Sequence, residues 1–278
     1  MTGRRRNRGR LATTLVATTT LLFMVPLAWL IVSSLRPSQD LFRHLTPLTL
    51  EAFVPTDVSL ENYQNLFDSG FGRAVFNSVF IAFVSVALGL FVNSMAAYAL
   101  AAIEFPGRSV LFVFVVLSFL VPFEAIAIPL SNTFRTLGID NGYPGLILPG
   151  VANGFAIFVL RQFFLGIPRD LREAAQIDGA SRWQVYWRIY MPLSKAPLVG
   201  AAILIFIFQW QAYLWPLLIV SDPDLQVASV SLAKLFGQYD FDAGQLLAGA
   251  VILAAIPAFL VVPLQRHFTG SIARSGLK

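Results

Sequence analysis

The sequence predicts an all-α integral membrane protein with six transmembrane helices and both termini on the cytoplasmic side. Three observations lead to this prediction. Of the 278 residues, 56% are hydrophobic and 13% are charged, a balance unlike that of an ordinary soluble domain. Six apolar segments are each long enough to cross a hydrocarbon core of about 30 Å. The basic residues gather in alternate loops, which indicates how the chain is oriented.

The six apolar segments alternate with polar stretches along the chain. They are Leu11–Leu35, Ala74–Ile103, Ser109–Phe134, Asn141–Leu160, Ala196–Ser221 and Ala243–Gln265. The first follows a basic stretch and could be read as a signal peptide. Its uncharged run is too long for the h-region of a signal peptide and no Ala-x-Ala site follows it, so we expect an uncleaved anchor.

The basic residues are distributed unevenly across the predicted membrane. With the N-terminus inside, the inner segments hold 15 of the 20 Lys and Arg residues and the outer segments hold the other 5. This asymmetry follows the positive-inside rule. It also accounts for the net charge of +5, because inner basic residues set orientation and contact anionic lipid. Nucleic acid is therefore not an expected partner.

The sequence offers little for catalysis or metal binding. It contains no Cys, so a disulfide framework, a thiolate metal site and a cysteine nucleophile are all excluded. Its two His residues are predicted on opposite sides of the membrane, and none of its three Lys stands in a Gly-rich phosphate-binding loop. We therefore expect no catalytic residue, no metal and no cofactor bound by this chain.

One inner loop differs from the others because it holds two short amphipathic helical stretches. Pro168 suits the first turn of a helix, since its φ is fixed and it has no N–H to leave unpaired. This helix is expected to end at Gly179, a good residue for the position after a helix. Ser181 then forms an N-cap and, with Gln184 three residues later, a capping box. The second helix is predicted to stop at Pro192.

The spacing of residues in this loop carries a family resemblance. The loop reads Glu173-Ala174-Ala175, then Gly179, Ile189 and Pro192. It resembles the EAA loop of ATP-binding-cassette (ABC) importer permeases, with Met191 where that family usually has Leu. The triplet Glu61-Asn62-Tyr63 and the inner turn from Ala97 to Arg108 are similar to the carbohydrate-type branch, although Ala102 stands where a basic residue is common. The chain thus looks like the smaller permease of maltose-type, binding-protein-dependent transporters.

The resemblance implies the type I importer permease fold, a place in the inner (cytoplasmic) membrane, and separate ATPase subunits that bind ATP and Mg. Closure of two such subunits would move the loop and re-open the transmembrane segments to the outside. The residues that it assigns to ATPase coupling are Glu173, Ala174, Ala175, Asp178, Gly179, Ile189 and Pro192. Ser271 and Arg274 in the C-terminal tail are expected to contact the same subunits. The alternative for Glu173 is an ordinary surface ion pair with Arg169 at i−4.

The resemblance also implies further partners and a solute class. Two ATPases need two coupling loops whereas this chain has one, and likeness to the maltose-type smaller permease favours a heterodimer with a second permease. An external solute-binding protein would deliver a sugar or sugar-like solute, whose identity these residues do not fix. The expected organisation is a basic arm at 1–10, a first helix and outer segment at 11–73, a core at 74–267 containing the coupling loop 164–195, and a tail at 268–278.

Polar residues inside the apolar segments are candidates for the translocation path. They are Glu124, Asn77, Asn93, Gln209, Gln211 and Tyr213. Glu124 is the only ionisable residue in an apolar span, so it either faces a pathway or gate or is an interfacial carboxylate near Pro122.

The other path candidates also have structural alternatives. The two Asn lie about 160° apart around a helix, so at least one is expected to serve helix packing. Gln209 and Tyr213 share one helical face and Gln211 shares another with Trp215, so both faces cannot look at a solute. Aromatic residues near a helix end can equally be belt or packing residues.

The main rival to an importer permease is a secondary transporter or channel that is not driven by ATP. Such a protein would need ionisable residues along its crossings or an inverted repeat. Only Glu124 is available, and no repeat is evident in the sequence.

Overall fold

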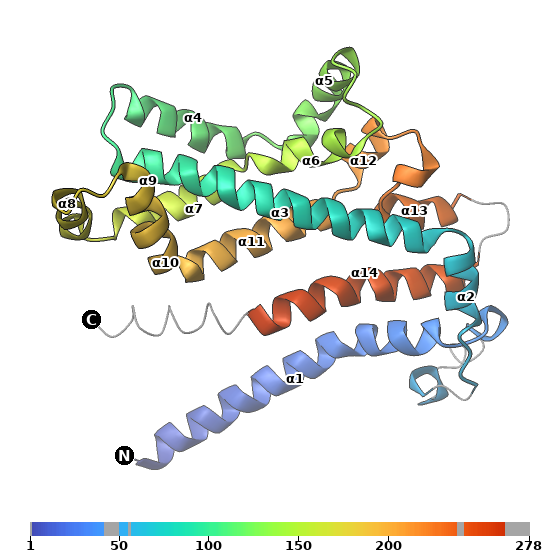
Figure 1. Ribbon diagram of the computed structural model, residues 1–278. Helices are drawn as coiled ribbons and strands as arrows, with labels where there is room; N and C mark the ends of the chain where they lie inside the picture. The colour runs from blue at the N-terminus through green and yellow to red at the C-terminus, as the bar shows by residue number, and fades with distance from the viewer. Residues whose placement is uncertain (1, 42–49, 55–56, 238–241, 265–278) are drawn as a thin grey trace. The chain divides into compact units, whose positions relative to one another are not determined.

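The computed structural model describes residues 2–41, 50–54, 57–237 and 242–264. Throughout these residues the regular structure is helical (Figure 1). The predicted tail contacts Ser271 and Arg274 lie outside the described residues. The chain divides into two compact units, one of Met1–Gly72 with Leu232–Ala255 and the other of Arg73–Ser231 with Ile256–Lys278. They are called the first and second units below.

The first unit combines the long helix α1 (Thr2–Ser34), two 3-10 turns (Ser38–Asp40 and Leu50–Phe53), α2 (Glu61–Asp68) and the first half of α14 (Ala243–Leu264). A polar cluster holds these pieces together. The buried amide of Asn62 donates to the carbonyls of Ser34 and Arg36 at 3.0 and 2.6 Å. The Ser38 hydroxyl lies 2.9 Å from Asn62 Oδ1 and 2.5 Å from Asp242 Oδ1.

The second unit contains most of the long helix α3 (Phe71–Ala102) and a series of shorter helices. These are α4 (Arg108–Leu120), α5 (Phe123–Thr136), α6 (Tyr143–Val151), α7 (Gly154–Leu165), α8 (Arg169–Ile177), α9 (Arg182–Val185), α10 (Met191–Leu193), α11 (Lys195–Trp210), α12 (Leu214–Ile219) and the start of α13 (Ala228–Leu235). Gly154 lets α7 approach α4 closely, because a Cβ there would lie 2.8 Å from the Val115 carbonyl oxygen.

Four stretches of the described chain are long and apolar enough to cross a membrane: Ala12–Ser34, Phe71–Ala102, Tyr143–Leu165 and Ala243–Leu264. Two bent helix pairs raise this number to six if each pair is one span. The predicted third crossing is such a pair, since α4 and α5 meet at 100°. Val121, which precedes Pro122, is extended with φ −80° and ψ 120°, as expected for a residue before proline. The third predicted crossing is therefore broken at Pro122.

The fifth predicted crossing is not one continuous helix. α11 ends at Trp210, and α12 begins only at Leu214, so residues 211–213 form a non-helical break. The other bent pair joins Arg182–Leu193 to α11 at 83°.

Candidate functional site

The inner loop singled out by the sequence forms two helical arms joined at a glycine. α8 ends in a Schellman motif, in which the Gly179 and Ala180 amides donate to the carbonyls of Gln176 and Ala175 at 3.0 and 2.9 Å. Gly179 has φ +82°, where a side chain would be strained. Ser181 then caps α9 with the predicted capping box. Residues 169–193 are called the two-armed element below.

The start and the end of the two-armed element differ from prediction by one residue each. Pro168 is the N-cap of α8 rather than its first helical residue. The second arm does not stop at Pro192, because it continues through a π-helical turn, Tyr186–Tyr190, and ends at Leu193. The wider turn ends two residues before Pro192, which has no N–H to donate to the preceding turn.

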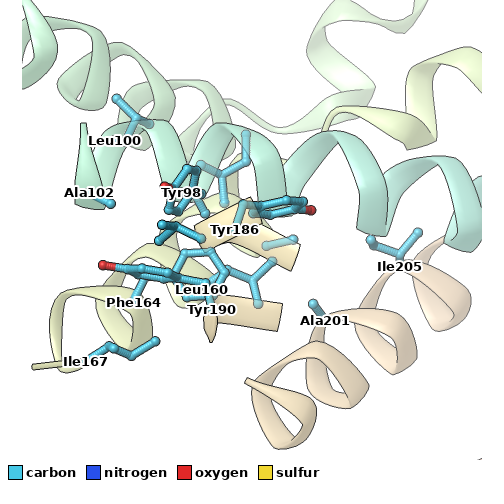
Figure 2. Close-up of a cluster of buried hydrophobic side chains, with 14 residues drawn as sticks. Tyr98, Leu100, Ala102, Leu160, Phe164, Ile167, Tyr186, Tyr190, Ala201 and Ile205 are labelled. Atoms are coloured by element: carbon cyan, nitrogen blue, oxygen red, sulfur yellow. The ribbon is translucent and has the colours of Figure 1, made fainter. Parts of the chain in front are cut away.

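One side of the second arm is packed into a buried aromatic core (Figure 2). Tyr186 and Tyr190 pack on Tyr98 of α3, with ring centroids 5.3 and 4.8 Å apart, and Phe164 of α7 lies 5.4 Å from Tyr190. The hydroxyl of Tyr98 donates to the Arg182 carbonyl at 3.1 Å. The hydroxyl of Tyr186 lies 2.7 Å from Ser94 Oγ. The second arm is therefore joined to α3 by both apolar and polar contacts.

Away from this core, the two-armed element carries exposed apolar side chains among charged and polar ones. Ile177 at the end of α8 is 86% exposed and Trp183 on α9 is 51% exposed, and Leu171 and Trp187 are also exposed. The Glu173 carboxylate is 59% exposed and lies 3.9 Å from Arg172 Nη2, so its ion-pair partner within the described residues is Arg172 and not Arg169. At this distance, and with the carboxylate exposed to water, the pair contributes little to stability.

A shallow cavity of about 400 Å³ lies between the two arms. It is lined by Ala175, Asp178, Gly179, Ala180, Gln184, Val185, Arg188 and Ile189. Four predicted coupling residues thus meet in one place, whereas Glu173, Ala174 and Pro192 do not line it. Ala175 and Ile189 also pack against the aromatic core, so their positions are fixed from behind.

Four of the six candidate path residues meet in a second cavity, of about 390 Å³. It is lined by Phe123, Glu124, Pro149, Gly150, Phe208, Gln209, Gln211, Ala212, Tyr213, Leu214 and Trp215. The expectation that the two faces carrying Gln209 and Gln211 cannot both look at a solute was wrong. It assumed a continuous helix, and the break at residues 211–213 turns both faces toward the same cavity.

Two helix breaks and two hydrogen bonds shape this cavity. Glu124 enters it from the first turn of α5, directly after the bend at Pro122. Gln209 Nε2 donates to the Leu146 carbonyl at 2.8 Å, and Trp215 Nε1 donates to the Gly145 carbonyl at 2.9 Å. The lining residues Phe123 and Phe208 were not predicted from the sequence. The signals that could have pointed to them were their neighbours Pro122 and Gln209.

Asn77 and Asn93 lie elsewhere, fully buried in α3. Asn93 serves the break between α6 and α7, donating to the Val151 carbonyl and accepting from the Asn153 amide at 3.0 and 2.9 Å. The Asn77 amide donates to two backbone carbonyls of the 222–227 segment at 2.8 and 2.9 Å, and its oxygen accepts from the Tyr143 hydroxyl. Both thus serve packing, and a role for them in the path stays a prediction.

No group of three or more His, Cys, Asp or Glu residues that could hold a metal ion is found within the described residues.

The sequence of residues 89–272 matches the family of binding-protein-dependent transport system inner membrane components. The chain belongs to this family. An arabinooligosaccharides transport system permease protein, AraQ of Halalkalibacterium halodurans, is 35% identical over 91% of this chain and 90% of its own length. The trehalose transport system permease protein SugB of Mycobacterium tuberculosis is 32% identical over 92% of both chains. These relatives are permeases of sugar transport systems, and the chain shares their family of binding-protein-dependent transport permeases, which is consistent with a non-catalytic subunit.

Solved structures share this fold. The crystal structure of a bacterial ABC transporter involved in the import of the acidic polysaccharide alginate superposes with a TM-score of 0.81, at 22% identity, over 96% of this chain and 98% of the other. A second structure, of a bacterial alginate ABC transporter in complex with its alginate pentasaccharide-bound periplasmic protein, gives a TM-score of 0.60 over 94% of this chain. The fold is therefore that of the type I ABC importer permease, consistent with a multi-pass inner membrane protein.

Proposed function

We propose that this chain is the smaller permease of an ATP-driven sugar importer and that its two-armed element receives the force of ATP-driven closure. One observation carries the proposal. The two-armed element is packed on one side into the aromatic core and elsewhere exposes apolar side chains among polar ones, with Ile177 at 86% exposure. Exposed apolar surface beside polar residues is typical of a protein–protein contact.

The proposal gives five of the seven coupling residues a role. The exposed Glu173 carboxylate meets a basic group on an ATPase subunit, and Ala174 permits close approach. Gly179 supplies the bend, and Ile189 and Pro192 hold the second arm in place. The element faces the cytoplasm, as do both termini and the tail residues Ser271 and Arg274. Rigid-body rocking of the packed helices then gives alternating access.

The proposed assembly contains one more permease, similar to this chain, two ATPase subunits and an external solute-binding protein. This chain has one two-armed element, so a second permease has to supply the contact for the second ATPase. ATP and Mg bind to the ATPase subunits.

The cavity at the α11–α12 break is proposed to form part of the sugar path. Its aromatic side chains can stack on the faces of sugar rings, and Gln209 and Gln211 can bond sugar hydroxyls. Among the described residues Glu124 is the only charged one that lines it, so it accepts hydrogen bonds from hydroxyls and repels anions. This favours an uncharged saccharide as the solute.

The test uses the assembled transporter, reconstituted with its ATPase and binding protein. Glu173→Ala and Gly179→Pro should leave the protein inserted and assembled in the membrane while solute uptake per ATP hydrolysed falls at least about tenfold. Asp170→Asn is the matched control, because it removes another exposed carboxylate of α8 outside the EAA spacing. Wild-type uptake in both variants at normal expression would remove the coupling assignment.

The rival, a secondary transporter or channel, is separated by a simpler measurement. Extraction under mild conditions should recover the chain together with an ATPase subunit, and uptake should require ATP rather than an ion gradient. A stable protein that transports by itself would support the rival.

A further inference from the structure

The C-terminal end of α3 has no basic residue of its own in its last turn. The last carbonyls of a helix lack amide donors from the following turn, and cations are favoured at that end of the helix dipole. Three arginines from other elements supply hydrogen-bond donors and positive charge at this end of α3. Arg161 Nε donates to the Leu100 carbonyl and Arg108 Nη1 to the Ile103 carbonyl, each at 3.1 Å, and Arg172 Nη1 donates to the Ala102 carbonyl.

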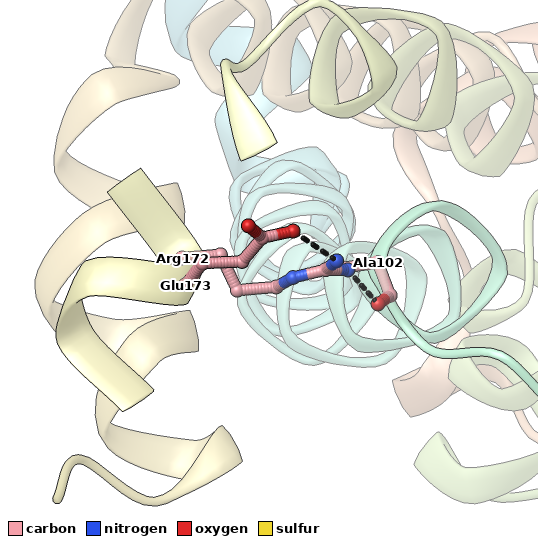
Figure 3. A network of polar contacts seen from close by, with 3 residues as sticks. All are labelled: Ala102, Arg172 and Glu173. Atoms are coloured by element: carbon pink, nitrogen blue, oxygen red, sulfur yellow. Dashed lines mark hydrogen bonds and ion pairs between the residues drawn. The ribbon is translucent and has the colours of Figure 1, made fainter. Parts of the chain in front are cut away.

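The three arginines attach α3 to different parts of the second unit. Arg161 comes from α7, and its guanidinium lies 3.8 Å from the ring centroid of Phe112 in α4. Arg108 is the first residue of α4. These two therefore join transmembrane helices to one another. Arg172 alone of the three comes from α8, the first arm of the two-armed element, and Figure 3 shows its side chain reaching from α8 to Ala102.

The first arm has few other attachments. None of its residues is fully buried, and Leu171 and Ile177 are exposed. Arg172 and Ala175, three residues apart and therefore on one face, are its only partly buried residues, and the Arg172 side chain is 18% exposed. The second arm, in contrast, is held through Tyr98, Tyr186 and Tyr190. The contact of Arg172 with Ala102 is thus the only hydrogen bond found between α8 and α3 in the described residues.

Holding the Arg172 side chain against Ala102 costs free energy. Its Nε is buried without a hydrogen-bond partner among the described residues. A buried donor without a partner loses the hydrogen bonds it would make with water. An arginine serving only solubility or lipid contact would extend into water instead.

We propose that Arg172 is a positioning residue that fastens α8 to the C-terminal end of α3, so that both arms and α3 move as one body. The inference rests on the proposed coupling function and adds the residue through which the first arm acts on a transmembrane helix. Without this contact, the first arm would swing about Gly179 while α3 stayed behind.

The first experiment compares Arg172→Gln with Arg108→Gln in the assembled transporter. Both variants remove a guanidinium from a carbonyl at the same helix end, but only the first releases α8. Arg172→Gln should lower the amount of solute transported per ATP hydrolysed at least about fivefold while binding of the ATPase subunits persists. Arg108→Gln should keep the wild-type ratio, and Arg172→Lys should restore part of the loss. Equal ratios in Arg172→Gln and wild type overturn the inference.

The second experiment needs no variant of Arg172 and stands even if Arg172→Gln fails to fold. The chain has no Cys, so spin labels can be placed at Met95→Cys on α3 and Asp170→Cys on α8, both exposed positions. The distance between the labels should be narrowly distributed and the same in nucleotide-free and ATP-trapped complexes. A change of several ångströms between the two states would mean that α8 moves independently of α3 and would overturn the inference.

The inference and the proposed function fail in different ways. If no ATPase subunit assembles with the chain, or if uptake does not need ATP, the proposed function is wrong. If uptake is driven by ATP and stops in Glu173→Ala but is unaffected in Arg172→Gln, the coupling loop stands and only the role of Arg172 is wrong.

Discussion

Two regions of the second unit, the surroundings of the two-armed element and the second cavity, use tyrosines and polar side chains in opposite ways. Around the two-armed element, α3 is continuous, and the hydroxyls of Tyr98 and Tyr186 are each engaged by a hydrogen-bond partner. Around the second cavity, α4–α5 and α11–α12 are broken, and Glu124, Gln211 and Tyr213 are exposed at the break.

Each arrangement is suited to a different task. A densely packed, hydrogen-bonded core moves as a unit and transmits displacement. A broken helix frees backbone groups and places amides beside open space, which is how transporter folds build solute sites. Substitutions in the two regions should therefore differ in whether they alter stability, solute preference or coupling.

The largest effect, on the free energy of unfolding, is expected at the break between α6 and α7, which depends on the side chain of Asn93. Asn93→Ala removes the donor for the Val151 carbonyl and the acceptor for the Asn153 amide, so two backbone groups are left unpaired. The free energy of unfolding should fall by at least about 2 kcal/mol. Denaturant unfolding in detergent measures it, with the exposed Asn132→Ala as control. An equal response in the two variants would mean that the break does not need Asn93.

A smaller effect, on solute preference, is expected from Glu124→Gln. Removing this carboxylate from the lining of the second cavity should favour acidic over neutral oligosaccharides by about tenfold relative to wild type. Competition for uptake between neutral and acidic oligosaccharides measures this ratio. The exposed Asp68→Asn should leave the ratio unchanged. Uptake per ATP should also stay at the wild-type value, and a loss of coupling instead would contradict the separation of the two regions.

A matched pair of tyrosines compares the regions directly. Tyr186→Phe removes a hydroxyl that lies 2.7 Å from Ser94 Oγ in a buried site, so the free energy of unfolding should drop by about 1 kcal/mol. Tyr213→Phe removes an exposed hydroxyl at the second cavity and should change stability by less than about 0.5 kcal/mol while raising the KM for uptake. Thermal unfolding and uptake kinetics on both variants test the contrast, which fails if Tyr213→Phe is the less stable protein.

The smallest effect, on the pH dependence of stability, is expected in the first unit. It serves as a reference because Asp242 lies outside both regions. Burial raises the pKa of the Asp242 carboxyl, but hydrogen bonds from Ser38, Gln245 and Gly244 outweigh it and hold that pKa below its usual range. A lowered folded-state pKa adds stability above the unfolded pKa, and this contribution is lost as the pH falls through the folded value. Asp242→Asn should therefore flatten the loss of stability in the acid range. Unfolding curves at several acid pH values measure it, and an unchanged slope would contradict it.

The local features of the site could be predicted from the sequence because their causes are local. Gly179 needs only a left-handed turn, and Ser181 with Gln184 needs only a spacing of three. The break at residues 211–213 was not predicted, although Pro216 was a local signal for it, because in a continuous helix its ring would clash with the carbonyl of Ala212. The contact between Arg172 and Ala102 spans 70 residues, and no local pattern encodes it.

The π-helical turn at Tyr186–Tyr190 holds one residue more than an α-helical path between the same ends would need. Removing one residue from this turn would restore ordinary winding and rotate everything before it by about 100°. Trp183 would then leave the exposed side of its arm, although no residue that touches it had been replaced. The direction in which the indole points is therefore set by chain length as much as by composition.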